Sequence, residues 1–537
     1  MAELNYKDLS VLVADDFSSF RSIVNGLLQS LGVTKVDMAS SGEDAISLCQ
    51  EKPYDVILCD YNLGQGRNGQ HVLEELRHRS LLGKESIFIM VSAEAARNIV
   101  MSAYDCEPDD YLMKPITARS LQQRMDRLLR LKRVMKPVYQ ALEQSNVYGA
   151  MDRLTEMSLA EDRYSLYAQK MLGELFIREG QLDKAERLYT RALEVRQVDW
   201  ARLGLARVKQ LKGDLDLAET WLERIVEDNP LFLPAYDVLA ENWEQKGERL
   251  HVQSTVQRAV DISPMSILRQ KRLSDVALLN KDFDTAISAL RKTVRLGELS
   301  CHGKAEDSID FARLVSSTIE QKLNVAGVSI AEALEYLDAA RDRYELDANR
   351  QAQCKLLSGR IHAIDGNAEM AEHFLEEANM VMDLDALDID LDLDHVSILL
   401  ALEKNKEANA RLDELKVKYM HDQDALQKLD EFLTEPVSDA NREMIAEVNR
   451  EGIDLYKHGE FDAALACFER VRELFPKHVG IQLNIAQTLI GKLKSGQADD
   501  KVVNHCQSSL DLVASLIDPD HPQYSRYCQL RRMAIAA

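Results

Sequence analysis

The chain has 537 residues and a formal net charge of −23. This length exceeds what one hydrophobic core holds, and this charge argues against binding to the phosphate backbone of nucleic acids. The sequence has no signal-peptide pattern at its start and no apolar run near the roughly 20 residues that span a bilayer. Its eight cysteines include no CxxC pair. We therefore expect a cytoplasmic protein of several domains that does not bind membranes.

Residues 9–133 alternate short apolar runs with amphipathic stretches, which predicts an α/β domain with a five-stranded parallel sheet and helices on both faces. The expected strands cover residues 11–14, 35–38, 56–59, 87–91 and 111–113. The expected helices cover residues 18–31, 42–50, 69–79, 94–104 and 117–134. After residue 135 the strand pattern ends and a helical periodicity replaces it.

Polar residues follow four of the apolar runs at the point where each run ends. Asp15 and Asp16 follow the first strand and Asp60 follows the third. Ser92 follows the fourth strand and Lys114 follows the fifth. Because ligands of an open parallel sheet bind just outside the carboxyl ends of its strands, three carboxylates, a hydroxyl and an ammonium group are expected to meet at one edge.

These residue types suit a magnesium ion and a phosphoryl group. Adjacent carboxylates repel each other, so the pair Asp15 and Asp16 indicates a bound cation, and Mg²⁺ prefers oxygen ligands. A carboxylate beside a metal ion, here Asp60, can attack a phosphoryl donor, and Lys114 can pair with the phosphoryl oxygens. Each residue alone is more simply a solvated loop acid or a surface lysine, but the agreement of four strands favours the joint site.

With these motifs, residues 9–133 resemble the receiver domain of two-component response regulators, which has a flavodoxin-like fold. The family pattern is matched by Asp15-Asp16, Asp60, Ser92-Ala93, Tyr111 and Lys114-Pro115. The resemblance implies that Asp16, Asp60 and the backbone carbonyl of Asn62 bind Mg²⁺ directly, with Asp15 acting through water. It also implies that a histidine kinase or a phosphotransfer protein phosphorylates Asp60.

The same resemblance assigns switching and tuning roles. Ser92 is expected to hydrogen-bond the phosphoryl group, with Tyr111 turning inward behind it and Lys114 contacting the phosphoryl oxygens. Asn62 and Glu94 occupy positions at which the family tunes its own dephosphorylation. Receivers of this family often pair through their fourth and fifth helices, which implies a homodimer as one state of the chain.

Two segments depart from the family pattern. After the acceptor the family usually has Met-Pro and then a glycine, whereas residues 62–69 read NLGQGRNG, one residue longer and without proline. We expect a looser loop that alters kinase recognition or the lifetime of the phosphoryl group. Before the fifth strand Glu107 replaces the usual glycine, and because glutamate disfavours a positive φ angle, we expect a different turn there.

A repeat of 34 residues dominates the rest of the chain. One copy has Leu205-Ala206, Gly213, Ala218, Leu222, Ile225 and Pro230, and the next has Leu239-Ala240, Gly247, Val252, Val256, Ala259 and Pro264. Further copies begin at Leu172, Leu273, Gly359 and Gly452. This pattern resembles the tetratricopeptide repeat (TPR), whose helix pairs bury their apolar faces by stacking. We therefore expect a receiver over residues 1–133 and an all-α TPR superhelix over residues 134–537.

Three other features have simpler interpretations. A basic stretch in the fifth helix and its extension is either a solvated face or a contact with the acidic repeat array or an acidic partner, with nucleic acid as a third alternative. It comprises Arg119, Arg124, Arg127, Arg130, Lys132, Arg133 and Lys136. The acidic run from Asp383 to Asp394 lacks the glycine and glutamate of a calcium-binding loop, so an acidic surface is expected. Cys301-His302 and His505-Cys506 have no partner ligands nearby in the sequence, so metal binding is not expected there.

The sequence predicts a phosphorylation-controlled adaptor that acts through protein–protein contact and is not an enzyme. Its partners would be the phosphoryl donor and an unidentified protein ligand of the TPR array. Two alternatives stay open. One is a constitutive TPR scaffold whose receiver does not switch. The other is an aspartyl-phosphate phosphatase, although such enzymes typically place their two acids one residue apart, whereas Asp15 and Asp16 are adjacent.

Overall fold

The computed structural model describes residues 5–93, 107–160, 162–382, 388–495 and 500–536. By its internal contacts the chain divides into two units, Met1–Tyr336 and Leu337–Ala537, and each is described by itself. Within the described ranges, no helix combines the length and the apolar character that a bilayer-spanning segment needs.

A five-stranded parallel sheet forms the N-terminal part of the first unit. The strands are β1 (Ser10–Ala14), β2 (Lys35–Ala39), β3 (Val56–Asp60), β4 (Ile87–Ser92) and β5 (Asp110–Met113). Their order in the sheet is β2-β1-β3-β4-β5, the order of flavodoxin-like folds. All neighbouring strands pair in parallel, so the predicted fold class of this part is confirmed.

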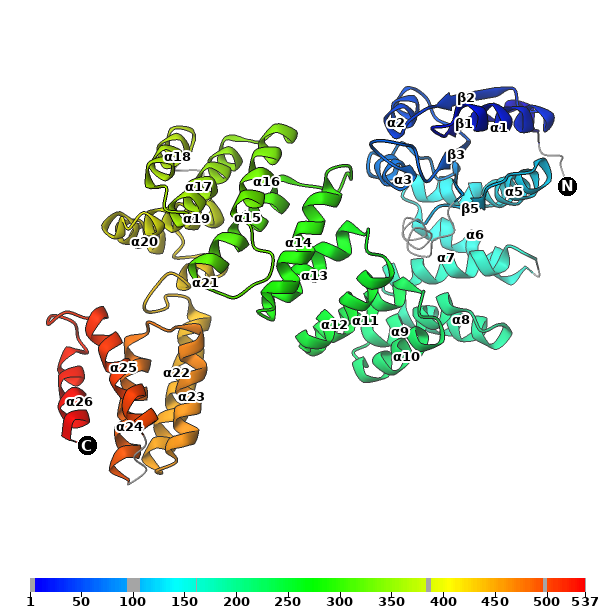
Figure 1. The fold of residues 1–537 in the computed structure, drawn as a ribbon. Helices are drawn as coiled ribbons and strands as arrows, with labels where there is room; N and C mark the ends of the chain where they lie inside the picture. The colour runs from blue at the N-terminus through cyan, green and yellow to red at the C-terminus, as the bar shows by residue number, and fades with distance from the viewer. Residues whose placement is uncertain (1–4, 94–106, 161, 383–387, 496–499, 537) are drawn as a thin grey trace. The chain divides into compact units, whose positions relative to one another are not determined.

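Helices cover both faces of this sheet (Figure 1). They are α1 (Ser18–Ser30), α2 (Gly42–Glu51), α3 (Gly69–His78) and α5 (Ala118–Glu143). Alternate residues of the strands enter two cores: Leu12 and Ile57 pack with α2 and α3, whereas Val11 and Val13 pack with α1 and α5. The fourth helix that the sequence predicts lies outside the described residues.

The last of these helices, α5, continues well past its expected end at residue 134. It runs through Pro137 to Glu143. Beyond the sheet, Met135, Val138 and Tyr139 are buried against α6 (Val147–Leu159) and α7 (Ser165–Arg178). The predicted boundary at 133/134 therefore falls inside one continuous helix that belongs to both the sheet domain and the helical array.

Antiparallel helix pairs follow at the repeat spacing. The first pair is α7 with α8 (Leu182–Val195), followed by α9 (Asp199–Leu211) with α10 (Leu215–Asp228). Then come α11 (Leu233–Lys246) with α12 (Arg249–Ile262), and α13 (Ile267–Leu279) with α14 (Phe283–Gly297). The glycines between paired helices take the left-handed conformation that commonly ends a helix, as at Gly213, where φ is 88°. Tyr189 shows why small residues recur, because its ring packs against Gly173 and Gly204 on neighbouring helices.

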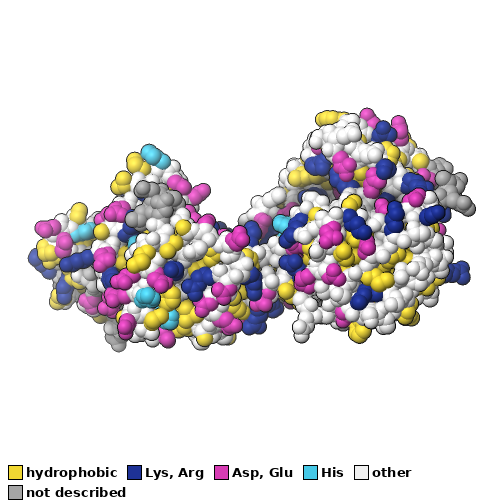
Figure 2. Space-filling model, turned by 90° about the horizontal axis from the view of Figure 1, so that it is seen from above, with side chains coloured by type: hydrophobic (Ala, Val, Ile, Leu, Met, Phe, Trp, Pro, Cys, Tyr) yellow, Lys and Arg dark blue, Asp and Glu magenta, His cyan; other side chains and the backbone are white. Residues whose placement is uncertain are grey.

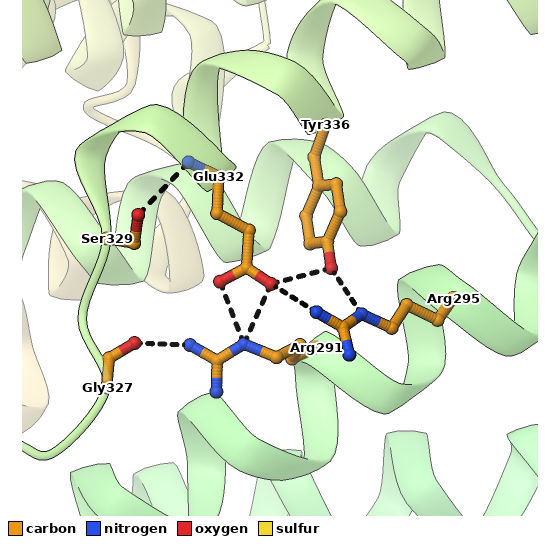
Figure 3. Close-up of polar contacts among 6 residues, drawn as sticks. All are labelled: Arg291, Arg295, Gly327, Ser329, Glu332 and Tyr336. Atoms are coloured by element: carbon orange, nitrogen blue, oxygen red, sulfur yellow. Dashed lines mark hydrogen bonds and ion pairs between the residues drawn. The ribbon is translucent and has the colours of Figure 1, made fainter.

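The irregular stretch after residue 300 is helical as expected, and it forms α15 (Ala305–Glu320) and α16 (Ile330–Arg343). An ion-pair network joins the start of α16 to α14 (Figure 3). The carboxylate of Glu332 accepts hydrogen bonds from Arg291 at 2.8 Å and from Arg295 at 3.0 Å. The Tyr336 hydroxyl also donates to this carboxylate, at 2.8 Å, so one partly buried acid connects α16 to α14.

The second unit is entirely helical in its described residues. Its helices are α17 (Ala348–Ile364), α18 (Ala368–Val381), α19 (Ile389–Ala401), α20 (Asn405–Lys418), α21 (Gln423–Asp430), α22 (Asp439–Lys457), α23 (Phe461–Leu474), α24 (Val479–Lys494), α25 (Asp500–Leu516) and α26 (Tyr524–Ala536). The pairs α17–α18 and α22–α23 carry the two repeat copies expected here.

The described part of the acidic run, Asp388 to Asp394, is not simply a surface feature, which corrects the sequence expectation; Asp383 and Asp385 lie outside the described residues. Asp392 is fully buried and Asp394 is 3 % exposed. Asp392 accepts hydrogen bonds from Arg411 at 2.7 Å and from Tyr419 at 2.7 Å. Asp394 accepts one from Gln353 at 2.8 Å. Buried carboxylates need such partners, and the cations come from the next helix.

Candidate functional site

Three carboxylates meet at the carboxyl edge of the sheet, as the strand ends predict. Asp15 and Asp16 follow β1, and Asp60 is the last residue of the neighbouring β3. One oxygen from each of the three lies within 4.8 Å of the others. Asp15 is fully buried and Asp60 is 6 % exposed, so the negative charges are concentrated in a poorly solvated pocket.

The ammonium group of Lys114 joins two of these acids. Its Nζ lies 2.6 Å from Asp15 Oδ2 and 2.8 Å from Asp60 Oδ2. The same Nζ lies 4.0 Å from the centre of the Phe20 ring. Burial lowers the pKa of Lys114, but the hydrogen bonds to both carboxylates outweigh burial and raise it. Lys114 is therefore held as a cation in the pocket.

One lysine does not fully compensate three carboxylates. Burial raises the pKa of Asp60 to about 6; Lys114 opposes this shift and the Asp15 charge adds to it. Asp16 Oδ1 is buried and has no hydrogen-bond partner among the residues that the structure describes. A buried carboxylate oxygen without a partner is rare in folded proteins, and a bound ion is one common explanation for it. The donor set consists of carboxylate oxygens, so it fits Mg²⁺.

The predicted hydroxyl and ring lie on the adjacent strands. Ser92 ends β4 and is 2 % exposed, and its carbonyl accepts a hydrogen bond from the Lys114 amide at 2.9 Å. Tyr111 on β5 is 8 % exposed and packs in the core beneath the pocket edge. Asn62 is exposed, and its side chain accepts a hydrogen bond from the Gly64 amide. Glu94 lies outside the described residues.

The loop after Asp60 is held at several points. Gly64 and Gly66 have φ angles of 79° and 91°, which glycine adopts readily. The Arg67 amide donates to Glu43 Oε1 at 3.2 Å, and the Gly69 amide donates to the Tyr61 carbonyl at 2.8 Å. Although this loop is one residue longer than the family pattern, these hydrogen bonds fix it to α2 and to the end of β3.

The same loop reaches the helical array, which the sequence did not indicate. Arg67 Nε donates to the carbonyl of Leu299, at 3.2 Å, in the corner between α14 and α15. Further along the chain, Glu74 of α3 accepts a hydrogen bond from Ser300 Oγ at 3.2 Å. These partners are more than 220 residues apart in the sequence, and no local pattern could have identified them.

The turn before β5 corrects another expectation. Glu107 itself adopts the left-handed conformation with φ of 49°, where the family usually has glycine. Its carbonyl accepts a hydrogen bond from Arg77 Nη2 at 2.5 Å, which helps to hold this conformation. The glutamate therefore keeps the positive φ angle and does not change the turn to avoid it.

The cations of α5 are mostly paired within the sheet domain. Arg124 and Arg127 bind Asp110, at 2.9 and 2.5 Å. Lys132 lies 2.9 Å from Asp109. Lys136 pairs with Glu85, and Arg130 pairs with Asp126. On the face of the molecule drawn in Figure 2, basic and acidic side chains are interspersed. This basic stretch therefore mainly stabilises the domain to which it belongs.

Comparisons with known proteins agree with the predicted receiver domain and with the predicted repeats. The model of the response regulator receiver domain matches residues 11–126, and that of the tetratricopeptide repeat matches residues 170–231 and 449–492. Chemotaxis protein CheY-3 of Vibrio cholerae is 31 % identical over 122 residues, which are 23 % of this chain and 92 % of that protein. Chemotaxis protein CheY of Pseudomonas aeruginosa is 31 % identical over 120 residues, 22 % of this chain and 95 % of that protein.

A solved structure of Vibrio cholerae chemotaxis protein CheY4 is 26 % identical in sequence. The match covers 22 % of this chain and 98 % of that chain, with a TM-score of 0.21. The receiver match lies at the N-terminal end and the repeat matches lie beyond it. The chain therefore belongs to the response regulators with a CheY-like receiver domain, and it continues from that domain into tetratricopeptide repeats.

Proposed function

We propose that this chain is a phosphorylation-controlled response regulator that accepts a phosphoryl group on Asp60 and acts through its TPR array. The observation that carries the proposal is the convergence of Asp15, Asp16, Asp60 and Lys114 at one sheet edge. The donor is a histidine kinase or a phosphotransfer protein, as for the family. Residues 1–133 act as the receiver and residues 134–537 as the output array.

The chemistry requires one nucleophilic substitution at phosphorus. An Asp60 carboxylate oxygen attacks the phosphorus of a phosphohistidine, the P–N bond breaks, and its electron pair stays on the imidazole nitrogen. The product is an acyl phosphate on Asp60. Asp16, Asp60 and the backbone carbonyl of Asn62 would hold a magnesium ion, with Asp15 acting through water, and the ion would supply positive charge to the phosphoryl oxygens. Lys114 supplies a further cation, since its ammonium group already lies 2.8 Å from the acceptor.

Two further residues connect the chemistry to a conformational change. Ser92 donates a hydrogen bond to the phosphoryl group, and Tyr111 packs inward behind it, so the ends of β4 and β5 report the charge on Asp60. Asn62 and Glu94 set the rate at which water removes the phosphoryl group. Ser92 and Tyr111 are both supported by their burial at the pocket edge.

The loop after Asp60 offers a direct route to the array. It starts at the acceptor, passes Asp16 at Gly64, and contacts Leu299 through Arg67. A shift of this loop on phosphorylation changes the contact between α3 and the α14–α15 corner. The array then gains or loses access to its protein ligand, or two chains pair through their receivers.

A phosphatase is the less supported reading of the same pocket. The acids after β1 are adjacent, and Lys114 is bonded to both Asp15 and Asp60. We infer that the acyl phosphate is a signal and not a turnover intermediate. Phosphomonoester hydrolysis by the full chain is expected to equal that of Asp60→Asn.

The test is phosphorylation of the full chain by acetyl phosphate with Mg²⁺, followed by intact-mass measurement and light scattering. We expect one added phosphoryl group that needs Mg²⁺ and is absent in Asp60→Asn. The matched control is Asp37→Asn, a carboxylate of the same sheet that pairs with Lys52. Labelling that survives Asp60→Asn would refute the assignment. Labelling that leaves the molar mass from light scattering, partner binding and hydrogen exchange of the array unchanged would identify a constitutive scaffold.

A further inference from the structure

The corner between α14 and α15 brings metal-binding side chains against α3. Cys301 and His302 have no partner ligand nearby in the sequence, but the fold places Glu74 of α3 beside them. The ligand atoms of these three residues lie within 4.8 Å of one another. All three are half-buried, and they come from two segments that the sequence separates by more than 220 residues.

The corner itself is held in one conformation. Gly297 and Gly303 approach so closely that a Cβ on Gly303 would lie 2.2 Å from the Gly297 carbonyl oxygen. Lys271 Nζ donates to the His302 carbonyl at 2.8 Å and pairs with Asp307 at 2.9 Å. The backbone that carries Cys301 and His302 is thus fixed by α13 and α15, which is what a preformed ligand site requires.

The helix side of the cluster is also oriented. Gln70 Nε2 donates to Glu74 Oε1 at 3.0 Å, and Ser300 Oγ donates to Glu74 Oε2 at 3.2 Å. Hydrogen bonds of this kind orient metal-bound carboxylates. His78 lies one turn further along the same helix face, and its ring centre is 6.0 Å from that of His302. It can reach the cluster by side-chain rotation, because it is exposed.

We propose that Glu74, Cys301 and His302 bind a zinc-class transition-metal ion, with His78 as the fourth ligand. Thiolate, imidazole and carboxylate together are the ligand types of tetrahedral zinc sites. Ligand atoms in such a site are roughly 3.3–3.8 Å apart, so the cluster, whose ligand atoms lie within 4.8 Å of one another, needs to contract by no more than about 1.5 Å. The sulfur and nitrogen donors distinguish it from the all-oxygen site at Asp60, which suits Mg²⁺.

The bound metal would join the receiver to the array. Two ligands belong to α3, which begins nine residues after Asp60, and two belong to the array corner. The metal would therefore strengthen the contact between α3 and the α14–α15 corner, to which the loop after Asp60 also contributes through the bond from Arg67 to Leu299. Metal binding itself does not rest on phosphorylation of Asp60, so the two proposals succeed or fail separately.

Cobalt(II) titration of the reduced full chain, in excess Mg²⁺, tests the site. We expect one equivalent to bind with the near-ultraviolet charge-transfer band of a cobalt–thiolate bond and the visible bands of tetrahedral cobalt. Zinc should displace it stoichiometrically and should raise the melting temperature. Binding without a charge-transfer band, or no binding, would overturn the proposal.

Variants assign the ligands. Cys301→Ser should abolish the charge-transfer band and weaken zinc binding by more than the roughly 10–100-fold that loss of a supporting residue causes. Glu74→Gln and His302→Ala should also weaken zinc binding. The control is Cys528→Ser, which changes another half-exposed free cysteine and should keep both the band and the affinity. Circular dichroism of each variant checks its folding. A band that survives Cys301→Ser, or is lost in Cys528→Ser, would refute the assignment.

Discussion

Gly69 lies against the backbone of Asp60 with no room for a side chain. A Cβ at Gly69 would lie 2.3 Å from the Asp60 carbonyl oxygen and 2.9 Å from Met90 Sδ. The first residue of α3 thus packs directly on the residue proposed to accept the phosphoryl group. The geometry of Asp60 depends on a glycine at this point, although Gly69 contributes no chemical group to the pocket.

Gly69→Ala is therefore expected to destabilise the receiver by about 2–3 kcal/mol, because backbone has to move to relieve the overlap. It should also slow labelling of Asp60 by acetyl phosphate. The matched control is Gly26→Ala in α1, where a Cβ would meet no atom of the described residues within 4 Å. That change should stabilise the helix by roughly 0.5–1 kcal/mol. Urea unfolding measures both, and equal effects of the two substitutions would contradict the packing argument.

Removal of Lys114 should strengthen magnesium binding while it weakens phosphorylation. In Lys114→Met the ammonium group no longer repels Mg²⁺, and Asp15 and Asp60 lose their shared cation. We expect Mg²⁺ affinity to rise about tenfold or more, which is ~1.4 kcal/mol. Labelling by acetyl phosphate should fall, because the phosphoryl oxygens lose a cation. Calorimetric titration checks the first effect, and an unchanged or weaker affinity would show that Lys114 does not compete with the metal.

The sheet edge could be predicted from the sequence because the ends of the strands are local signals, and the carboxyl ends of parallel strands meet at one edge. Each apolar run ended at the residue that the structure places in the pocket, as for Asp60 and Lys114. The contacts of Arg67 and Glu74 with the array could not be predicted, because they depend on how distant helices stack. The burial of Asp392 was missed for the same reason, since the cations that compensate it belong to another helix.

Glu107 shows that a residue preference can be overruled by its surroundings. A non-glycine residue in the left-handed region costs about 1 kcal/mol, and this turn keeps the positive φ angle of 49°. Glu107→Gly should therefore stabilise the receiver by about 1 kcal/mol. Glu107→Ala, which removes the side chain but keeps the backbone cost, should bring no such gain. Chemical unfolding of both variants checks this, and equal stabilisation by alanine would place the effect in the glutamate side chain.

Arg67 provides a way to separate phosphorylation from its output. Arg67→Ala removes the hydrogen bond to the Leu299 carbonyl and leaves Asp15, Asp60 and Lys114 in place. We expect normal labelling of Asp60 with Mg²⁺ and acetyl phosphate. Hydrogen exchange in residues 297–304 should then respond to phosphorylation much less than in the parent chain, because the loop no longer contacts this corner.

The control for this comparison is Arg79→Ala. Arg79 pairs with the buried Glu75 of α3 at 2.5 Å, and Arg67 lies 3.8 Å from the same carboxylate. Arg67 also bonds to Leu299 of the array, whereas Glu75, the partner of Arg79, lies within the receiver. Loss of an Arg–Glu75 pair alone should therefore leave the phosphorylation response of residues 297–304 intact. If both variants abolish the response, the signal passes through Glu75 and α3. If neither does, the route from Asp60 to the array lies elsewhere than in this loop.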